Sequence, residues 1–230
     1  MSGATTGPLR LILFDVDGTL VDSQGTIVAC MTEAFVAEGL EPPQRAAILS
    51  IVGLSLPQAL AQLAATQTVP VQEALVAGYK RAYQAARLRE GAAHSPLYPG
   101  ARAALDTLHA VPEYLLGVAT GKSQRGLDAL IEGHDLGMFV TRQVADHHPS
   151  KPHPSMVQTC LAETGVDAAD AVMVGDTSYD MEMARSAGVR GLGVSWGYHA
   201  DDALVEAGAV HILQAFDEMP AALANLWETP

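Results

Sequence analysis

The chain has 230 residues, and 49% of them are apolar, which suits one large α/β domain or a core with a small second domain. Its formal net charge of −13 argues against a nucleic-acid partner, which would require a basic face. No stretch approaches the roughly 20 apolar residues of a membrane span, and the first ten residues hold no apolar run of signal-peptide length. Cys30 and Cys160 show no zinc or disulfide spacing, which favours free thiols in a reducing compartment. Together these observations predict a cytoplasmic protein without a membrane or nucleic-acid partner.

The first part of the chain combines one strand pattern with a long helical block. Residues 9–14 form a short apolar run that ends at Asp15 and suits a buried parallel strand. No strand pattern follows until about residue 93. Helices are expected instead at 26–40, 44–52, 57–65 and 71–90. We therefore predict an all-α helical domain, residues 22–95, inserted into a core formed by residues 1–21 and 96–230.

The remaining chain alternates strand and helix patterns. Further strands are expected at 114–119, 138–145, 171–174, 191–194 and 209–213, and helices at 101–110, 124–131, 154–164 and 178–187. This alternation predicts a Rossmann-like parallel sheet with helices on both faces, a three-layer α/β/α core.

Polar residues follow the expected strands, and in open parallel sheets functional sites form at the carboxyl ends of the strands. Turn chemistry explains Asp-Gly at 17–18 and Gly-Asp at 175–176 taken singly, but it does not explain why acids, a threonine and a lysine meet at one edge. The residues at this edge are Asp15, Asp17, Gly18, Thr19, Thr120, Gly121, Lys122, Lys151, Asp176, Thr177 and Asp180.

The residue types at this edge point to phosphoryl chemistry. Clustered carboxylates repel one another and imply a cation, and all-oxygen ligation selects a hard ion such as Mg²⁺. A lysine and a hydroxyl beside them suit a phosphoryl group. Asp15 and Asp17 are two residues apart and would point the same way on a strand. One carboxylate can attack phosphorus, and a second carboxyl can give its proton to the leaving oxygen.

Four segments resemble, in the right order, the signature motifs of the haloacid dehalogenase-like hydrolase superfamily. They are Leu-Phe-Asp15-Val-Asp17-Gly-Thr19-Leu-Val-Asp-Ser23, Val-Ala-Thr120-Gly-Lys122, Lys151-Pro-His-Pro and Val-Gly-Asp176-Thr-Ser-Tyr-Asp180-Met. The helical block between the first two motifs matches the inserted cap of one large branch. The segments 97–100, 151–154 and 196–199 are similar to the phosphoglycolate phosphatase-like group.

The resemblance implies a nucleophile, an acid and a metal site. Asp15 would be the nucleophile and form an aspartyl-phosphate. Asp17 would act as general acid and then as general base, with its backbone carbonyl on Mg²⁺. Asp176 would be a further metal ligand, so the implied metal set is Asp15, Asp17 and Asp176.

The resemblance also implies groups that bind the substrate. Thr120 and Lys151 would hold the phosphoryl oxygens, and Asp180 would be a supporting acid near the metal or Lys151. The second motif reads Thr-Gly-Lys where Thr-Asn-Lys is common. Gly121 keeps the backbone donor of that position but lacks the side chain.

The expected function is Mg²⁺-dependent hydrolysis of a small phosphorylated metabolite, with phosphoglycolate as the candidate from group similarity. A dehalogenase would lack Asp17. A phosphosugar mutase would keep Asp17 but usually differs around Asp176 and Asp180. A pyrophosphatase needs the same core and differs in the cap, and a non-catalytic regulator would have lost Asp15 or Asp17. A monomer and a homodimer both stay open.

Other features allow two interpretations. The histidines near Lys151, which are His147, His148 and His153, suit a transition-metal site or, as we prefer, a polar loop. The loop 53–56 either points at the substrate or forms a plain turn between helices. The cations Arg45 and Lys80 in the helical block either contact the substrate or lie on a solvated face.

Overall fold

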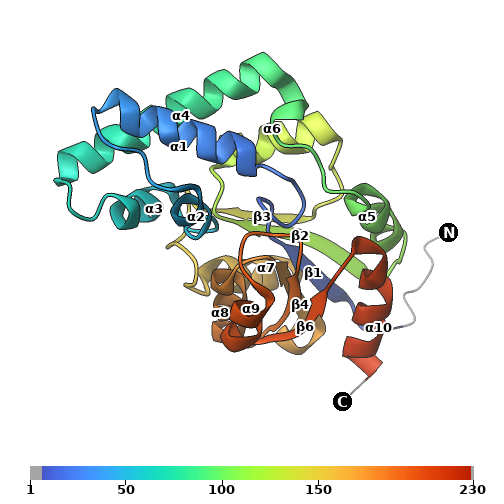
Figure 1. The fold of residues 1–230 in the computed structure, drawn as a ribbon. Helices are drawn as coiled ribbons and strands as arrows, with labels where there is room; N and C mark the ends of the chain where they lie inside the picture. Colours follow the sequence, from blue (N-terminus) through green and yellow to red (C-terminus); the bar gives the residue numbers. More distant parts are fainter. Residues whose placement is uncertain (1–6, 229–230) are drawn as a thin grey trace.

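Six strands form one parallel sheet in the order β3-β2-β1-β4-β5-β6 (Figure 1). The computed structural model describes residues 7–228. The strands are β1 (Arg10–Phe14), β2 (Tyr114–Thr120), β3 (Thr141–Val144), β4 (Ala171–Gly175), β5 (Arg190–Val194) and β6 (Ala209–Leu213). All six predicted strands are confirmed, and β3 is shorter than the predicted 138–145. The central strands are buried on both faces, which explains their nearly continuous apolar sequences.

Helices cover both faces of the sheet, as predicted. One apolar cluster joins Ile12 and Phe14 of β1 to α5 (Ala101–His109), α6 (Gln124–His134) and α10 (Met219–Glu228). A second cluster joins Leu11 and Leu13 to α7 (Ser155–Thr164) and α8 (Ser178–Ser186) on the opposite face. Successive β1 side chains point to opposite faces, so this strand anchors both helix layers.

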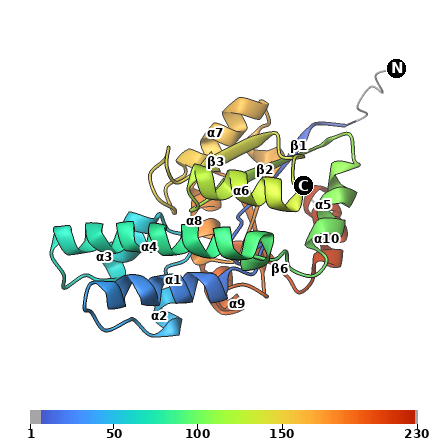
Figure 2. The same ribbon diagram turned by 90° about the horizontal axis from the view of Figure 1, so that it is seen from above.

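The helical block between β1 and β2 has an apolar core of its own. It contains α1 (Gln24–Ala37), α2 (Arg45–Leu49), α3 (Leu56–Leu63), α4 (Val69–Glu90) and the short helix η1 (Gly91–His94). The two long helices α1 and α4 lie side by side (Figure 2). We call this block the cap. The predicted boundaries of cap and core stay predictions, and residues 1–6 and 229–230 of the predicted core lie outside the described residues.

Two details of the helix prediction were wrong. The helix predicted at 44–52 ends at Leu49, because the chain then turns toward the core. Gly53 has a φ of 99°, which other residues rarely adopt, and the Tyr179 hydroxyl donates a hydrogen bond to the Ser50 carbonyl at 3.1 Å. The sequence analysis also missed α9 (Asp201–Ala207) and α10. The helix α9 is too short to show a clear helical period.

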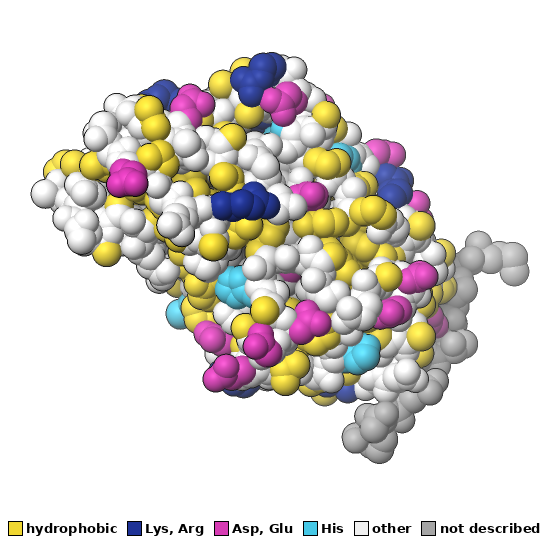
Figure 3. Space-filling model, viewed as in Figure 1, with side chains coloured by type: hydrophobic (Ala, Val, Ile, Leu, Met, Phe, Trp, Pro, Cys, Tyr) yellow, Lys and Arg dark blue, Asp and Glu magenta, His cyan; other side chains and the backbone are white. Residues whose placement is uncertain are grey.

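The distribution of surface charge is uneven. On the face shown in Figure 3, acidic side chains gather over the lower part, where α9 lies in Figure 1, and basic side chains lie mainly over the cap. Cys30 and Cys160 are buried free thiols. Within residues 7–228, every helix is too short or too polar to cross a membrane.

Candidate active site

Four buried polar residues lie at the carboxyl edge of the sheet. Asp15 directly follows β1, Thr120 is the last residue of β2, and Asp176 directly follows β4. Lys151 lies between β3 and α7. Each of the four is at most 1% exposed. The parallel register aligns the ends of β1, β2 and β4, so local strand pairing alone brings three of these residues to the same level.

The buried cluster carries more negative than positive charge. The Lys151 Nζ lies 2.8 Å from Asp15 Oδ1 and 2.6 Å from Asp180 Oδ1. Carboxylate oxygens of Asp15, Asp176 and Asp180 all lie within 4.8 Å of one another. Three carboxylates therefore face one ammonium group, and at neutral pH the cluster requires protons or a further cation.

The pKa directions agree with this excess of negative charge. Burial raises the pKa of Asp15 to about 6, although the Lys151 ammonium opposes the change. Burial also raises the pKa of Asp176 well above its ordinary value, and repulsion from Asp15 and Asp180 adds to this effect. Burial by itself would lower the pKa of Lys151, but Asp15 and Asp180 reverse this and raise it. Lys151 therefore stays a cation.

The hydrogen bonds within the cluster indicate which oxygens remain for a metal. Asp180 is occupied, since its Oδ1 pairs with Lys151 and its Oδ2 accepts from the Thr177 backbone and hydroxyl at 3.1 and 2.7 Å. At Asp15, Oδ1 pairs with the Lys151 ammonium at 2.8 Å, whereas Oδ2 accepts no hydrogen bond from the described residues. A buried carboxylate with one free acceptor oxygen close to Asp176 fits a hard divalent cation such as Mg²⁺.

The absence of a side chain at Gly18 allows the turn after β1 to pack directly against Asp176. Gly18 has a φ of 87°, and a Cβ atom there would lie 2.1 Å from Asp176 Oδ2. The same carboxylate accepts hydrogen bonds from the Thr19 hydroxyl at 2.8 Å and the Tyr198 backbone N–H at 3.0 Å. The Asp-Gly-Thr turn therefore closes directly around the acid that follows β4.

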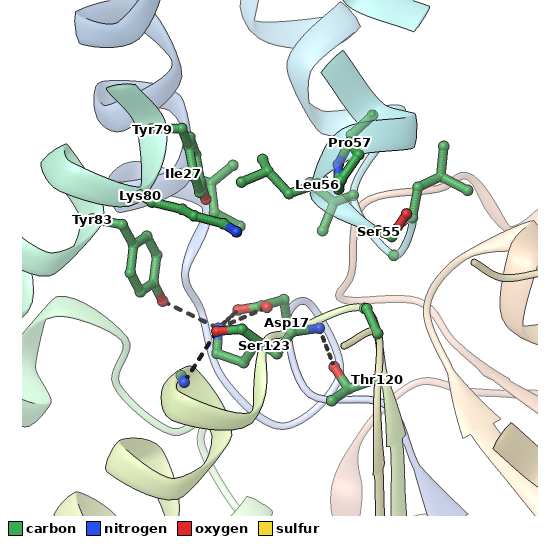
Figure 4. A pocket seen from close by; sticks show the side chains of 18 of the residues that line it. Asp17, Ile27, Ser55, Leu56, Pro57, Tyr79, Lys80, Tyr83, Thr120 and Ser123 are labelled. Carbon is green, nitrogen blue, oxygen red and sulfur yellow. Dashed lines mark hydrogen bonds and ion pairs between the residues drawn. The ribbon is translucent and has the colours of Figure 1, made fainter. Parts of the chain in front are cut away.

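Asp17 lies apart from the buried cluster. Its two carboxylate oxygens lie 2.6 and 2.7 Å from the Lys122 Nζ, and the Ser23 hydroxyl donates to it at 2.5 Å. Lys122 also donates to the Tyr83 hydroxyl on α4 at 3.1 Å (Figure 4). The strand argument for Asp15 and Asp17 was wrong, because β1 ends at Phe14. Tertiary contacts, and not strand alternation, orient Asp17.

A pocket of about 610 Å³ lies between the carboxyl edge of the sheet and the cap. Asp15, Asp17, Thr120 and Gly121 line it from the core, and the loop 53–56 lines it from the cap. Lys80 also lines the pocket, whereas Arg45 does not. Arg45 donates a hydrogen bond to Gln24. Of the two interpretations of loop 53–56, the structure therefore favours a loop that faces the site.

Gly121 explains how closely the cap approaches the core. A Cβ atom on Gly121 would lie 2.5 Å from the Gly53 carbonyl oxygen and 2.8 Å from that of Leu54. A side chain at this position would collide with the backbone of the cap loop. The departure from Thr-Asn-Lys is therefore matched by a loop that occupies the space an asparagine side chain would need.

The structure brings together all the predicted site residues and adds others. Thr120, Lys151, Asp176 and Asp180 meet at the sheet edge, and Asp17 and Gly121 face the pocket beside them. The sequence analysis quoted Lys122 and Tyr198 in motifs without giving them a contact. Ser23, the last residue of the first motif, was likewise quoted without a contact, and Tyr83 had no sequence signal.

The histidines near Lys151 form a polar loop, as we preferred. The His148 ring bonds to the Ser155 hydroxyl at 2.8 Å and to Gln143 Oε1 at 2.9 Å. The His153 Nδ1 accepts a hydrogen bond from the Ser155 backbone. In residues 7–228 the only group with metal-ligand spacing is Asp15, Asp176 and Asp180.

Comparison with protein families agrees with this site. Residues 12–194 match the family described as haloacid dehalogenase-like hydrolase, and this range contains all four motifs. The chain belongs to this family. The predicted family is thereby confirmed, together with its Rossmann-like fold.

Relatives of this chain carry phosphatase names. A protein of Dickeya dadantii named "Probable phosphatase IndB" is 36% identical over 92% of both chains. A phosphoglycolate phosphatase of Rhodospirillum rubrum is 29% identical over 90% of this chain and 88% of its own. The prediction of a phosphoric monoester hydrolase agrees with these names.

Solved structures show the same fold. A hydrolase from Pseudomonas syringae has a TM-score of 0.82 at 25% identity and covers 94% of this chain and 98% of its own. A phosphatase from Clostridium acetobutylicum, named from prediction, has a TM-score of 0.84 at 22% identity and covers 95% of this chain and all of its own. At 22% identity, the similarity to the Clostridium acetobutylicum structure shows a shared fold and nothing more.

Proposed function

We propose that this protein is a Mg²⁺-dependent phosphatase that hydrolyses a small phosphate monoester through an aspartyl-phosphate on Asp15. One observation carries the proposal. Asp15 is buried and lines the pocket, its Oδ1 pairs with Lys151, its Oδ2 accepts no hydrogen bond from the described residues, and it lies close to a second acid, Asp176. This is the environment of a nucleophile that is held by a cation on one oxygen and keeps its other oxygen available.

In the first step, an oxygen of Asp15 forms a bond to phosphorus, and the bond between phosphorus and the ester oxygen breaks. Asp17 gives its proton to the departing oxygen, so the alcohol leaves neutral. The Thr120 hydroxyl and the Lys151 ammonium bind the phosphoryl oxygens. Mg²⁺ on Asp15, Asp176 and the Asp17 carbonyl would offset the charge that grows on the phosphoryl group.

In the second step, water attacks phosphorus and releases Asp15 and inorganic phosphate. Asp17 takes the proton of that water and is ready to donate it in the next cycle. The geometry supports a role for Asp17, because Lys122 and Ser23 hold its carboxylate in a fixed position beside the pocket. Asp180 acts through Lys151, which it orients from α8.

The leaving group is the open part of this proposal. Relatives named phosphoglycolate phosphatases make phosphoglycolate the reference substrate. We also propose that the cap closes over the pocket and excludes bulk water during turnover. The cytoplasmic location and the choice between monomer and homodimer stay predictions.

The decisive experiment measures phosphate release from phosphoglycolate, sugar phosphates, nucleotides and pyrophosphate, with Mg²⁺ and with a chelator. Asp15→Asn is expected to lower turnover by about 10³-fold or more while leaving the fold intact. Asp17→Asn is expected to lower turnover as well, because it removes the acid of the first step and the base of the second. Acid quenching of the parental enzyme during turnover is expected to trap a phosphorylated enzyme, detected by the added mass of one phosphoryl group. An Asp15→Asn variant with normal turnover would remove Asp15 as the nucleophile.

Other outcomes of the same screen would reassign the protein. Isomerisation of a sugar phosphate without phosphate release would indicate a mutase, and cleavage of pyrophosphate alone would indicate a pyrophosphatase. The absence of Mg²⁺-dependent turnover on every substrate would favour a non-catalytic role.

A further inference from the structure

The pocket is much larger than the reference substrate requires. Its volume is about 610 Å³, within the range of roughly 300–1,000 Å³ that is typical of sites for drug-sized ligands. Glycolate is one of the smallest hydroxy acids. With phosphoglycolate bound at Asp15, most of the space beneath the cap would still contain water.

The far side of this pocket is mainly apolar. Figure 4 shows Ile27, Leu56 and Tyr79 across the pocket from Asp17. The rings of Tyr79 and Tyr83 stack, with their centroids 5.8 Å apart and an interplanar angle of 26°. An anion such as glycolate gains little from such a wall, because a charge near apolar groups loses its hydration. An apolar leaving group gains binding free energy there, because its own surface and the apolar side chains of the wall are both removed from water.

Lys80 is the available cation on this wall. Its side chain points into the pocket in Figure 4, and no carboxylate of residues 7–228 forms an ion pair with it. The other cationic side chains that line the pocket have partners. Lys122 pairs with Asp17, Arg87 donates to the Arg125 carbonyl, and Arg125 donates to Gln84.

We infer that the cap selects a phosphate monoester whose leaving group has an apolar ring or branched body and an anionic or acceptor group that Lys80 binds. The inference rests on the proposed function, because it concerns the leaving group of the same reaction. The apolar wall supplies affinity for the body of the substrate, and Lys80 fixes the end that lies away from phosphorus.

A matched set of substrates tests this inference on the intact protein with Mg²⁺. Benzyl phosphate and phosphoglycolate both release a primary alcohol, so they differ mainly in the group that faces the cap. We expect kcat/KM for benzyl phosphate to exceed that for phosphoglycolate by about tenfold or more. 4-Carboxybenzyl phosphate is expected to be better still, because its distal carboxylate meets Lys80.

Two variants connect these preferences to the cap. Leu56→Asn is expected to lower kcat/KM for benzyl phosphate about fivefold relative to phosphoglycolate, since it places an amide on the apolar wall. Val36→Asn makes the same kind of change on α1 at a side chain that is 60% exposed and outside the pocket. It should leave the ratio unchanged. Lys80→Met is expected to abolish the advantage of 4-carboxybenzyl over benzyl phosphate.

The outcomes separate failure of this inference from failure of the proposed function. A kcat/KM for phosphoglycolate equal to or above that for benzyl phosphate would overturn the apolar leaving group while leaving the phosphatase intact. An unchanged 4-carboxybenzyl advantage in Lys80→Met would overturn the role of Lys80. The absence of Mg²⁺-dependent phosphate release from all three substrates, with no phosphorylated enzyme trapped by acid quenching of the parental protein, would overturn the proposed function itself.

Discussion

The ammonium group of Lys122 lies 2.6 Å from one carboxylate oxygen of Asp17 and 2.7 Å from the other. Both side chains are largely buried, at 8% and 13% exposure. Burial alone would lower the pKa of Lys122, but the Asp17 charge reverses this and raises it. Because Lys122 also contacts Tyr83 of α4, the cap is linked directly to the proposed acid and base of the reaction.

This link predicts that Lys122 positions Asp17. Lys122→Met is expected to lower kcat by about 10²-fold with a smaller effect on KM, because Asp17 loses the donor that orients it. Tyr83→Phe removes only the hydroxyl and should cause a smaller loss of the same kind. Steady-state kinetics over a range of pH would measure both effects. A Lys122→Met enzyme with the parental kcat and pH profile would contradict this role.

Lys151 is expected to stabilise the fold as well as bind phosphate. Lys151→Met leaves the carboxylates of Asp15 and Asp180 buried without their cation, and it should lower the free energy of unfolding by about 3–5 kcal/mol near neutral pH. The loss should be smaller in acid, where protons neutralise the carboxylates. Urea unfolding at both pH values measures the difference.

The matched control for this prediction is Lys80→Met, which makes the same substitution at an exposed lysine. It should change the free energy of unfolding by less than about 0.5 kcal/mol. Equal changes in the free energy of unfolding for Lys151→Met and Lys80→Met would contradict a stabilising role for the buried ion pairs.

The stability of the protein should depend on Mg²⁺ and pH together. In the absence of Mg²⁺, burial raises the pKa of Asp15 from an ordinary value of 3.8 to about 6, so the folded chain binds this proton more tightly than the unfolded chain. That stabilisation is fully present below pH 3.8 and is lost as the pH rises through about 6. The upward shift at Asp176 acts in the same direction.

Mg²⁺ is expected to replace these protons, so it should raise the Tm more at about pH 8 than at about pH 5. Thermal unfolding with Mg²⁺ and with a chelator at both pH values measures the effect. Asp176→Asn should greatly reduce it. A rise in Tm that is the same at both pH values, or that persists in Asp176→Asn, would argue against a metal at this cluster.

Gly121 is expected to control how closely the cap approaches the core. Gly121→Ala places a Cβ atom 2.5 Å from the Gly53 carbonyl oxygen, so the loop must shift at a cost of about 1–3 kcal/mol. We expect kcat/KM to fall about tenfold and hydrogen exchange in residues 50–56 to become faster. Gly137→Ala is the control, since a Cβ atom there has open space. Unchanged exchange in Gly121→Ala would contradict the close contact.

The sequence by itself predicted the sheet and the edge at which the site forms. Apolar runs marked the strands, although only weakly at β3, and the residues after them, such as Asp15 and Asp176, had to meet because parallel strands end on the same side. These statements depend on local periodicity and on a general rule of topology, so no tertiary contact is needed to make them. The family resemblance followed from the same short segments.

Only the tertiary structure decided the partners of these residues. Lys122 lies 105 positions from Asp17 in the chain, and no spacing rule indicates that they pair or that Tyr83 joins them. The apolar wall beneath the cap arises because α1, α3 and α4 each contribute one side to the pocket. Contacts of this kind depend on how whole elements pack, whereas a sequence pattern reports only which face of each element is apolar. The sequence thus predicted the end of the site that binds phosphate, and the packing of the cap decided the shape of the end that faces the leaving group.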